Sequence, residues 1–314
     1  EIQLILVDDG SKDKSLEIAQ NYKVKFPENV VVISKENGGQ ASARNLGLKH
    51  AQGKYVNFLD SDDYLSRNTL KDVYNFFEAH IDEIDVVAIP MFLFERVEGP
   101  HRLNNKFETE RVIDLLKDPN NPLLSSSSSF IKYDAIKDYE FDTGLVNLED
   151  ALVINKILLE KNKYGVINTA KYYYRQRITQ NSTVDSANTK KEYFTDRLKG
   201  FYLNLIDYCI DKCGEVPLFI QYLMAYDLQW LLRTQNLDVF DTKEEVDEFW
   251  DTLNKVLKHI SKEVVYDNEN ITFYVYPFFL YLLNPPIVID AVAYSFVWKK
   301  IIGTIIACLS TFSE

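Results

Sequence analysis

The first 90 residues alternate apolar runs of strand length with segments of helical spacing, and this alternation constrains the fold more than any other feature. The strand-like runs are "IQLILV", "VVVIS", "KYVNFLD" and "DVVAIPMFLFE", and between them lie "SKDKSLEIAQNYKVKF", "GQASARNLGLKHA" and "SRNTLKDVYNFFEAH". Such alternation favours parallel strands joined by helical crossovers. We therefore predict an α/β fold in which a ligand lies beyond the carboxyl ends of the strands.

Acidic turns follow the predicted strands. "VDDGS" ends the first strand, "LDSDD" ends the third, and "NLED" comes later in the chain. In "LDSDD", Asp60, Asp62 and Asp63 repel one another: one like-charge pair at ~5 Å costs roughly 3 kcal/mol at an effective dielectric of about 20. A cation, a neighbouring arginine or plain solvent could offset this cost.

Charge and size exclude some classes of protein. The 314 residues are 46% hydrophobic and carry a formal net charge of −12. A sizeable core can therefore form. A broad nucleic-acid-binding face is disfavoured because phosphate backbones require clustered lysine and arginine. We expect no nucleic-acid partner.

The character of the chain changes twice after residue 98. Residues 98–129 are polar and contain the run "SSSSS", which predicts a loop over the site or a flexible linker. "GLVNLEDALVINKILLEK" then predicts a helix that begins near Thr143 or Asn147, and "YGVINTAKYYYRQR" predicts a last strand. Successive helical patterns follow. We predict two domains, residues 1–186 and a mainly α-helical region, residues 187–314.

Two very apolar segments lie in the tail, "ITFYVYPFFLYLL" and "IVIDAVAYSFVWKKIIGTIIACL". Neither contains the ~18 uninterrupted apolar residues of a membrane span. Three interpretations stay open for residues 271–312: buried helices of the second domain, a helix that binds a membrane surface or a partner, and a true span.

Taken with "ENGGQASARNLG", the acidic turns resemble those of the inverting family 2 glycosyltransferases, which have the GT-A fold, a Rossmann-like mixed sheet flanked by helices. The resemblance covers about residues 1–185. It implies a metal-dependent transfer of a sugar from a UDP-sugar donor to a hydroxyl of a cell-surface glycan or teichoic-acid-like acceptor, such as a polyol phosphate. The helical region resembles appendages of capsular polysaccharide and teichoic acid transferases.

By this resemblance, "LDSDD" is the metal motif: Asp62 is the main ligand of Mn²⁺ or Mg²⁺, and Asp60 contacts the metal or the ribose. Such cations prefer oxygen ligands and can stabilise a leaving diphosphate. The alternative is a solvated turn in which Ser61 and Asp63 cap the next helix.

The resemblance also implies a nucleotide site. Asp8 or Asp9, preferably Asp9, accepts a hydrogen bond from the base, while Asn37 and Arg44 contact the base and brace the acidic residues. The alternative for "VDDGS" is a helix cap. Arg175, Arg177 and Ser182 match a segment that closes over the diphosphate, and the alternative is a solvated strand end.

The same resemblance makes Asp150 the general base and Glu149 its support. A single base without an enzyme nucleophile implies inversion. The alternative is an ordinary acidic first turn of a helix, favoured by the helix dipole.

Several expectations concern the whole protein. The family's first strand is absent, so we interpret the chain as starting after it. We expect a cytoplasmic location at or near the inner membrane face, with peripheral membrane contact and homo-oligomerisation left open. Two rival functions remain: a non-catalytic GT-A-like subunit of a polysaccharide assembly complex, and a receiver domain phosphorylated on an aspartate. The receiver is disfavoured because no Met-Pro follows Asp60.

Overall fold

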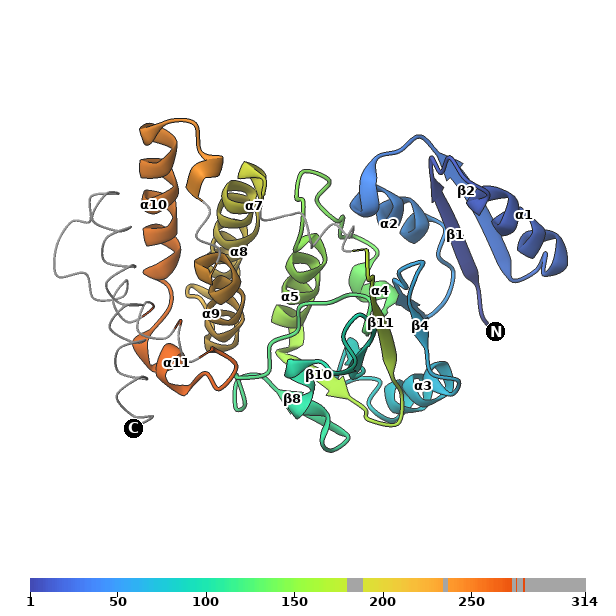
Figure 1. Cartoon of the computed structure of the whole chain (residues 1–314). Coiled ribbons are helices and arrows are strands. Elements are labelled where there is room, and N and C mark those ends of the chain that lie inside the picture. The colour runs from blue at the N-terminus through green and yellow to red at the C-terminus, as the bar shows by residue number, and fades with distance from the viewer. Residues whose placement is uncertain (180–188, 234–236, 273–274, 276–278, 280–314) are drawn as a thin grey trace, which may run out of the picture.

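The structure is a computed structural model that describes residues 1–179, 189–233, 237–272, 275 and 279 (Figure 1). The α/β part occupies one side and the helical region the other, with the helix α5 between them. The elements of the α/β part are β1 (Leu4–Asp9), α1 (Ser15–Lys25), β2 (Val30–Lys35), α2 (Gly39–Lys49), β3 (Tyr55–Asn57), β4 (Tyr64–Leu65), α3 (Thr69–Ala79), β5 (Val86–Ala88), β6 (Met91–Glu95), β7 (Gly99–Pro100), η1 (Arg102–Phe107), β8 (Arg111–Asp114), β9 (Ser129–Lys132), α4 (Tyr133–Ile136), α5 (Glu149–Lys161), β10 (Lys163–Val166) and β11 (Tyr172–Gln176).

The strands form three sheets. Their orders are β1-β2, β3-β9-β5-β10-β8 and β4-β11-β6-β7. Three pairs are parallel, namely β1 with β2, β5 with β10, and β6 with β11. The predicted mixed α/β architecture is confirmed, but an all-parallel sheet is wrong, because β9 lies antiparallel between β3 and β5.

Two predicted strands are each divided into two. The run expected as one strand over residues 85–95 becomes β5 and β6, which lie in different sheets. Pro90 separates them, since proline has no amide to continue a ladder. Its carbonyl accepts a hydrogen bond from the Tyr172 amide at 3.0 Å. The run expected over residues 164–177 is likewise divided into β10 and β11, which follow β5 and β6 into the two sheets.

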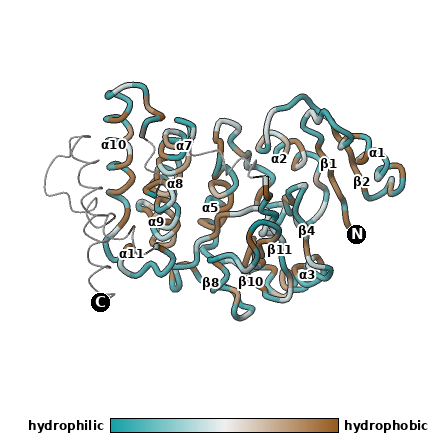
Figure 2. The backbone as a smooth tube through the Cα atoms, viewed as in Figure 1, coloured by the Kyte–Doolittle hydropathy of each residue, from teal (hydrophilic) through white to brown (hydrophobic). Residues whose placement is uncertain are grey.

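Within the described residues the helical region consists of five α-helices, one π-helical segment and one short 3-10 helix. They are α7 (Lys191–Asp196), the π-helical η2 (Arg197–Leu203), α8 (Asn204–Cys213), α9 (Leu218–Arg233), η3 (Leu237–Val239), α10 (Lys243–Leu257) and α11 (Lys262–Asp267). Figure 2 shows apolar residues along α5, α8 and α9. The predicted boundary at residue 186 lies outside the described residues and stays a prediction.

One hydrophobic core runs through both parts. A single cluster of buried side chains includes Ala41 of α2, Ile154 of α5, Leu205 of α8, Leu228 of α9 and Val256 of α10. A smaller cluster lies between α3 and the sheets that contain β5 and β11. The helical region is therefore packed onto the α/β part and shares its core.

The serine run is a buried loop that leads into β9, so the predicted loop is confirmed and the predicted flexible linker is wrong. Ser126 to Ser129 are buried, and Ser129 begins β9. The Asn57 side-chain amide donates to the carbonyls of Ser127 at 2.7 Å and Ser129 at 2.8 Å. Hydrogen bonds within the protein satisfy this backbone, so the loop can be buried despite its polar composition.

None of the helices in the described part of the chain has both the length and the apolar character needed to cross a membrane. Most of the two apolar tail segments lies outside the described residues, so the three interpretations offered for them are not tested here.

Candidate active site

The turn after β1 is joined to the start of α2. The Asp9 carboxylate accepts hydrogen bonds from the Gly38 amide at 2.9 Å and the Gly39 amide at 2.7 Å, and it pairs with Lys35 Nζ at 2.5 Å. Burial opposes ionisation, but these donors lower the pKa of Asp9. Gly39 has φ +84°, a conformation that glycine adopts at little cost. Asp9 therefore caps α2.

Asp8 and Asn37 of the predicted nucleotide site are also held by hydrogen bonds. Asp8 accepts from the Ser34 hydroxyl at 3.0 Å and from the Ser11 amide at 3.3 Å. Hydrogen bonds from Ser11 and Ser34 lower the pKa of Asp8. Asn37 Nδ2 donates to the Asp9 carbonyl at 2.9 Å. This turn thus presents a fixed polar surface beside the amino end of α2.

Arg44 of α2 joins two of the acidic motifs. Its guanidinium donates to Glu149 Oε1 at 2.7 Å and to Asp60 Oδ1 at 3.2 Å. The arginine side chain is only 8% exposed. A fixed, buried guanidinium between two carboxylates reduces their repulsion. Arg44 therefore supplies part of the charge compensation that the acidic turn requires.

Two adjacent serines, which the sequence reasoning did not single out, hold the same carboxylates from the other side. The Ser127 hydroxyl donates to Asp60 Oδ2 at 2.9 Å. The Ser126 amide donates to Asp150 Oδ2 at 3.0 Å, and its hydroxyl lies 3.4 Å from the same oxygen. The sequence held no signal that could have identified them, because they stand in a run of identical polar residues.

The catalytic pair of the resemblance, Glu149 and Asp150, opens α5. The preceding Leu148 has φ +67°, a left-handed conformation that is strained for a side chain of this type. Glu149 is buried, whereas Asp150 is partly exposed. Burial, followed by the charge of Asp150, raises the pKa of Glu149 to about 7. Asp150 is therefore the more accessible of the two carboxylates.

Asp62 and Asp63 have different environments. Asp62 Oδ2 pairs with Arg177, 2.8 Å from Nε and 2.7 Å from an Nη atom. Asp63 accepts from the Tyr172 hydroxyl at 2.5 Å and from the Arg175 amide at 2.7 Å. Burial, helped by Asp60 and Asp62, raises the pKa of Asp63 to about 6. Asp63 thus has a structural role, and Asp62 is held by a single cation.

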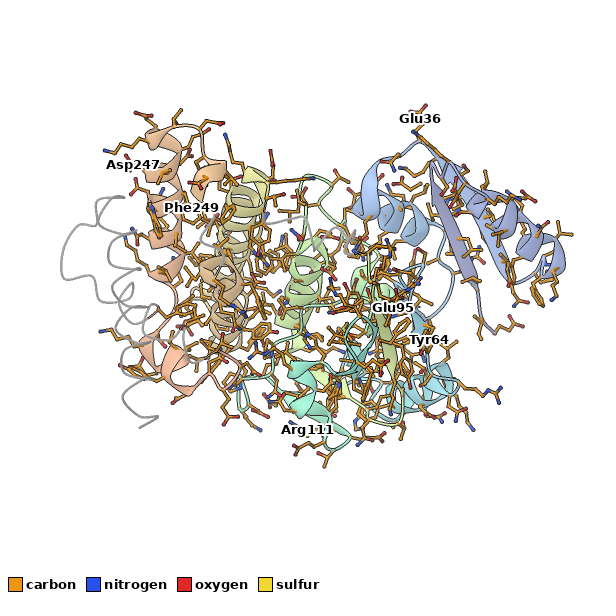
Figure 3. The ribbon with its side chains drawn as sticks, viewed as in Figure 1. Glu36, Tyr64, Glu95, Arg111, Asp247 and Phe249 are labelled. Atoms are coloured by element: carbon orange, nitrogen blue, oxygen red, sulfur yellow. The ribbon has the colours of Figure 1, made fainter. Side chains whose placement is uncertain are left out.

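The predicted diphosphate contacts are distributed unequally. Arg177 lies at the acidic turn, but the Arg175 side chain pairs with Glu95 at the end of β6, which Figure 3 shows beside β11. Ser182 lies outside the described residues. We define the carboxylate cluster as Asp60, Asp62, Asp63, Glu149 and Asp150, with Arg44 and Arg177 as its cations.

The carboxylate cluster fits a divalent cation only in part. Among the described residues, no three histidine, cysteine, aspartate or glutamate side chains are grouped to hold a metal ion. Asp60 and Asp62 retain side-chain exposures of 35% and 25% and offer carboxylate oxygens. Mg²⁺ is commonly held by one or two carboxylates together with substrate phosphates. These two residues suit a cation whose coordination a diphosphate completes.

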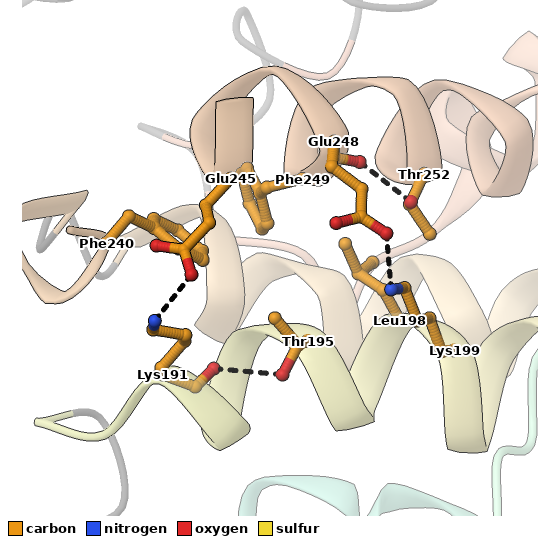
Figure 4. Close-up of a pocket in the computed structure, with 9 residues that line it drawn as sticks. All are labelled: Lys191, Thr195, Leu198, Lys199, Phe240, Glu245, Glu248, Phe249 and Thr252. Atoms are coloured by element: carbon orange, nitrogen blue, oxygen red, sulfur yellow. Dashed lines mark hydrogen bonds and ion pairs between the residues drawn. The ribbon is translucent and has the colours of Figure 1, made fainter. Parts of the chain in front are cut away.

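A hollow in the helical region does not adjoin this cluster. It lies between α7 and η2 on one side and α10 on the other (Figure 4). Its charged side chains are paired, Lys191 with Glu245 at 2.7 Å and Lys199 with Glu248 at 2.6 Å. Since its charges are neutralised within the protein, it is a weaker candidate for a charged substrate.

The fold is of the GT-A class. The crystal structure of S. aureus TarS 1–349 in complex with UDP-GlcNAc superposes with a TM-score of 0.65 at 24% identity, covering 89% of this chain and 78% of that chain. Residues 1–140 match the family model "Glycosyl transferase family 2", so this part of the chain is a family 2 glycosyltransferase domain. The receiver-domain alternative is therefore wrong.

Two curated relatives come from Bacillus subtilis (strain 168). The minor teichoic acid biosynthesis protein GgaB is 43% identical over 277 residues, which are 88% of this chain and 31% of GgaB. The minor teichoic acid biosynthesis protein GgaA is 33% identical over 280 residues, which are 87% of this chain and 63% of GgaA. The chain thus spans about a third of one relative and under two thirds of the other.

Proposed function

We propose that this protein is a metal-dependent inverting glycosyltransferase that moves a sugar from a UDP-sugar to a hydroxyl of a teichoic-acid-like acceptor. The observation that carries the proposal is the position of Arg44. It binds Asp60 of the metal motif and Glu149 of the base motif, the latter 105 residues away in the chain. The two halves of the expected chemistry therefore lie at one place.

The donor and the acceptor are inferred from the relatives. GgaB and GgaA are named as teichoic acid biosynthesis proteins, and TarS was crystallised with UDP-GlcNAc. These names support a UDP-sugar donor and a polyol-phosphate acceptor for this chain. The same context supports work at the cytoplasmic face of the membrane. The choice between GlcNAc, GalNAc, glucose and galactose is left to experiment.

In this proposal Asp150 is the general base. Its carboxylate accepts the proton of the acceptor hydroxyl while the acceptor oxygen forms a bond to the anomeric carbon, and the bond from that carbon to the UDP oxygen breaks. A positioned base contributes about 10²–10⁴-fold to a rate. Ser126 orients Asp150 through two contacts to one oxygen, and Glu149 with Arg44 holds the first turn of α5 in place. Attack from the face opposite the leaving group inverts the sugar.

Asp62 and Asp60 would hold the divalent cation. When bound, it supplies positive charge to the leaving diphosphate. Arg177 lies at the same carboxylate and adds a second positive group near that position. Asp9 and Asn37, beside the amino end of α2, would hold the nucleoside.

The test measures transfer from each of four UDP-sugars to poly(ribitol phosphate) and poly(glycerol phosphate), with Mn²⁺ or EDTA. We expect turnover with one donor, loss of turnover in Asp62→Ala, and a fall of about 10²–10⁴-fold in Asp150→Asn. Asp134→Asn, an exposed position on α4, is the matched control.

A thermal-shift arm separates binding from chemistry. UDP at a hundredfold excess over its dissociation constant should stabilise the protein by about 2.7 kcal/mol. Stabilisation by UDP without turnover of any donor would instead support the non-catalytic subunit. Equal turnover with Mn²⁺ and with EDTA would overturn the metal role of Asp62.

A further inference from the structure

Gly200 in η2 lies directly against Leu145, a residue of the loop that leads to the catalytic pair. A Cβ atom placed on Gly200 would lie 2.4 Å from Leu145 Cδ2 and 3.4 Å from Cγ. Side-chain carbons normally meet at about 3.5–4.0 Å. Only glycine therefore fits at this position without movement of Leu145.

Leu145 has little freedom to move aside. It is 8% exposed and belongs to the core cluster shared by the two parts of the protein. It stands four residues before Glu149 in the chain. Because interiors are close-packed, a displacement of Leu145 must be taken up by its neighbours or by the loop itself.

The loop is fixed at its start by α2. Asn45 makes two hydrogen bonds to the backbone of Phe141, each 2.8 Å long. At its other end the loop leads into the left-handed Leu148. Between these points the helical region supplies the contact from Gly200. The loop is thus held from both parts of the protein.

The segment that carries Gly200 is firmly supported. The buried Asp227 pairs with Arg197 at 2.8 Å and also accepts from the Tyr202 hydroxyl, so it joins both ends of η2 to α9. η2 is π-helical, a form that often occurs as a local bulge at functional sites. The loop should therefore yield before the support behind Gly200 does.

We propose that Gly200 is a positioning residue, through which the helical region sets the location of Glu149 and Asp150 by its close contact with Leu145. The inference rests on the proposed function for its catalytic consequence. It assigns the helical region a role in the reaction itself, in addition to any role in binding an acceptor.

The test introduces one methyl group and then removes the atoms it meets. Gly200→Ala should lower kcat by about 10–100-fold, the scale expected when a catalytic group is misplaced by about 1 Å. The KM for the UDP-sugar should stay close to that of the wild type, because the donor contacts lie on other elements. Lys199→Ala, the adjacent position, is the matched control, since its side chain pairs with Glu248 at the surface.

When Leu145 is already alanine, Gly200→Ala should lower kcat far less than it does in the wild type. The double variant Gly200→Ala/Leu145→Ala should therefore have a kcat close to that of Leu145→Ala alone. Such non-additivity is expected of residues in contact. A fold that was merely damaged would give additive losses. Wild-type kcat in Gly200→Ala, or a loss that Leu145→Ala does not relieve, would overturn the proposal.

Hydrogen exchange decides the inference without any activity. The amides of residues 142–152 should exchange faster in Gly200→Ala and return to the rate of Leu145→Ala in the double variant. Unchanged exchange in Gly200→Ala would overturn the positioning role. If the wild type transfers no sugar, the proposed function fails, but these exchange rates still test the contact.

Discussion

At the scale of single residues, Arg177 forms an ion pair with Asp62, the carboxylate that we assign to the metal. Its guanidinium lies 2.7 Å from Asp62, and both side chains are partly exposed. A partly exposed ion pair contributes up to about 1 kcal/mol. A cation that binds Asp62 must compete with this pair, and a bound diphosphate offers Arg177 another anionic partner.

The Arg177→Ala variant should bind Mn²⁺ more tightly than the wild type when no nucleotide is present, by up to about fivefold, because the competing cation is gone. Sugar transfer should nevertheless be slower. Isothermal titration with Mn²⁺ measures the first effect. Arg175→Ala is the control, since that side chain pairs with Glu95. Equal Mn²⁺ affinity in both variants and the wild type would contradict this account.

Glu149 makes stability depend on pH. Its folded-state pKa is raised to about 7, above the ordinary value of 4.5, chiefly by burial. Between these values the folded state binds more protons than the unfolded state, so stability falls as pH rises from about 4.5 to about 7. In Glu149→Gln the free energy of unfolding should fall less over this pH range than it does in the wild type.

Urea unfolding midpoints at pH 5 and pH 8, measured in EDTA, test this expectation. Asp134→Asn again serves as the control and should keep the fall of the wild type. The same pH dependence in Glu149→Gln as in the wild type would mean that Glu149 is not responsible.

The sequence predicted the acidic residues of the site better than their partners. Asp60, Asp62, Glu149 and Asp150 stand in short motifs whose order along the chain is distinctive. Ser126 and Ser127 stand in a run of identical polar residues, which carries no periodicity to place them. Their contacts with Asp150 and Asp60 depend on the path of the chain between β8 and β9, and that path is set by tertiary packing.

At the scale of elements, the start of α2 is capped from outside the helix. Asp9, at the end of β1, accepts the amides of Gly38 and Gly39, and Gly38 itself has no side chain that could cap. The carboxylate therefore serves a helix that begins about 30 residues later. This links the relative position of β1 and α2 to one side chain.

Asp9→Ala should lower the free energy of unfolding by about 0.5–2 kcal/mol, the range for loss of a helix cap. Asp9→Asn should cost less, because its carbonyl oxygen can still accept one amide. Chemical denaturation without nucleotide measures both. Lys35→Ala removes the ion pair with Asp9 and a hydrogen bond to the Glu36 carbonyl but leaves the cap in place, and it is the control for charge. If Asp9→Ala kept the stability of the wild type and lost only affinity for UDP, Asp9 would bind the nucleotide without contributing to the helix cap.

Element types were predicted more accurately than element boundaries. The helices α2, α3 and α5 follow their apolar spacing, and β1 and β2 follow their apolar runs. The strand expected over residues 85–95 was wrong because Pro90 allows the chain to change sheets between two apolar runs, and hydropathy is the same on both sides of it. The two runs differ in their pairing: β5 pairs with β9 and β10, and β6 pairs with β11.

At the scale of the whole molecule, the helical region is joined to the α/β part by a common core and also contains a buried ion pair of its own. Asp227 is 3% exposed and pairs with Arg197. Removing one partner of a buried pair leaves an uncompensated charge and costs about 3–5 kcal/mol. Since the core is continuous, this cost should lower the free energy of unfolding of both parts together.

Asp227→Ala should therefore shift the entire unfolding curve to lower urea concentration as one transition. Far-ultraviolet circular dichroism and hydrogen exchange in α2, measured together, follow the two parts of the chain. Glu248→Ala, which breaks the exposed pair with Lys199, should cost less than about 1 kcal/mol. Two separate transitions, of which Asp227→Ala shifts one and leaves the other unchanged, would show that the two parts unfold independently.

The pairing of Arg44 with Glu149 has a consequence for the order of events during translation. The arginine leaves the ribosome long before its acidic partner is synthesised, and until then its guanidinium faces Asp60 alone. A nascent chain arrested before residue 149 should thus lack the contact that joins α2 to the start of α5, however well its first strands have already paired.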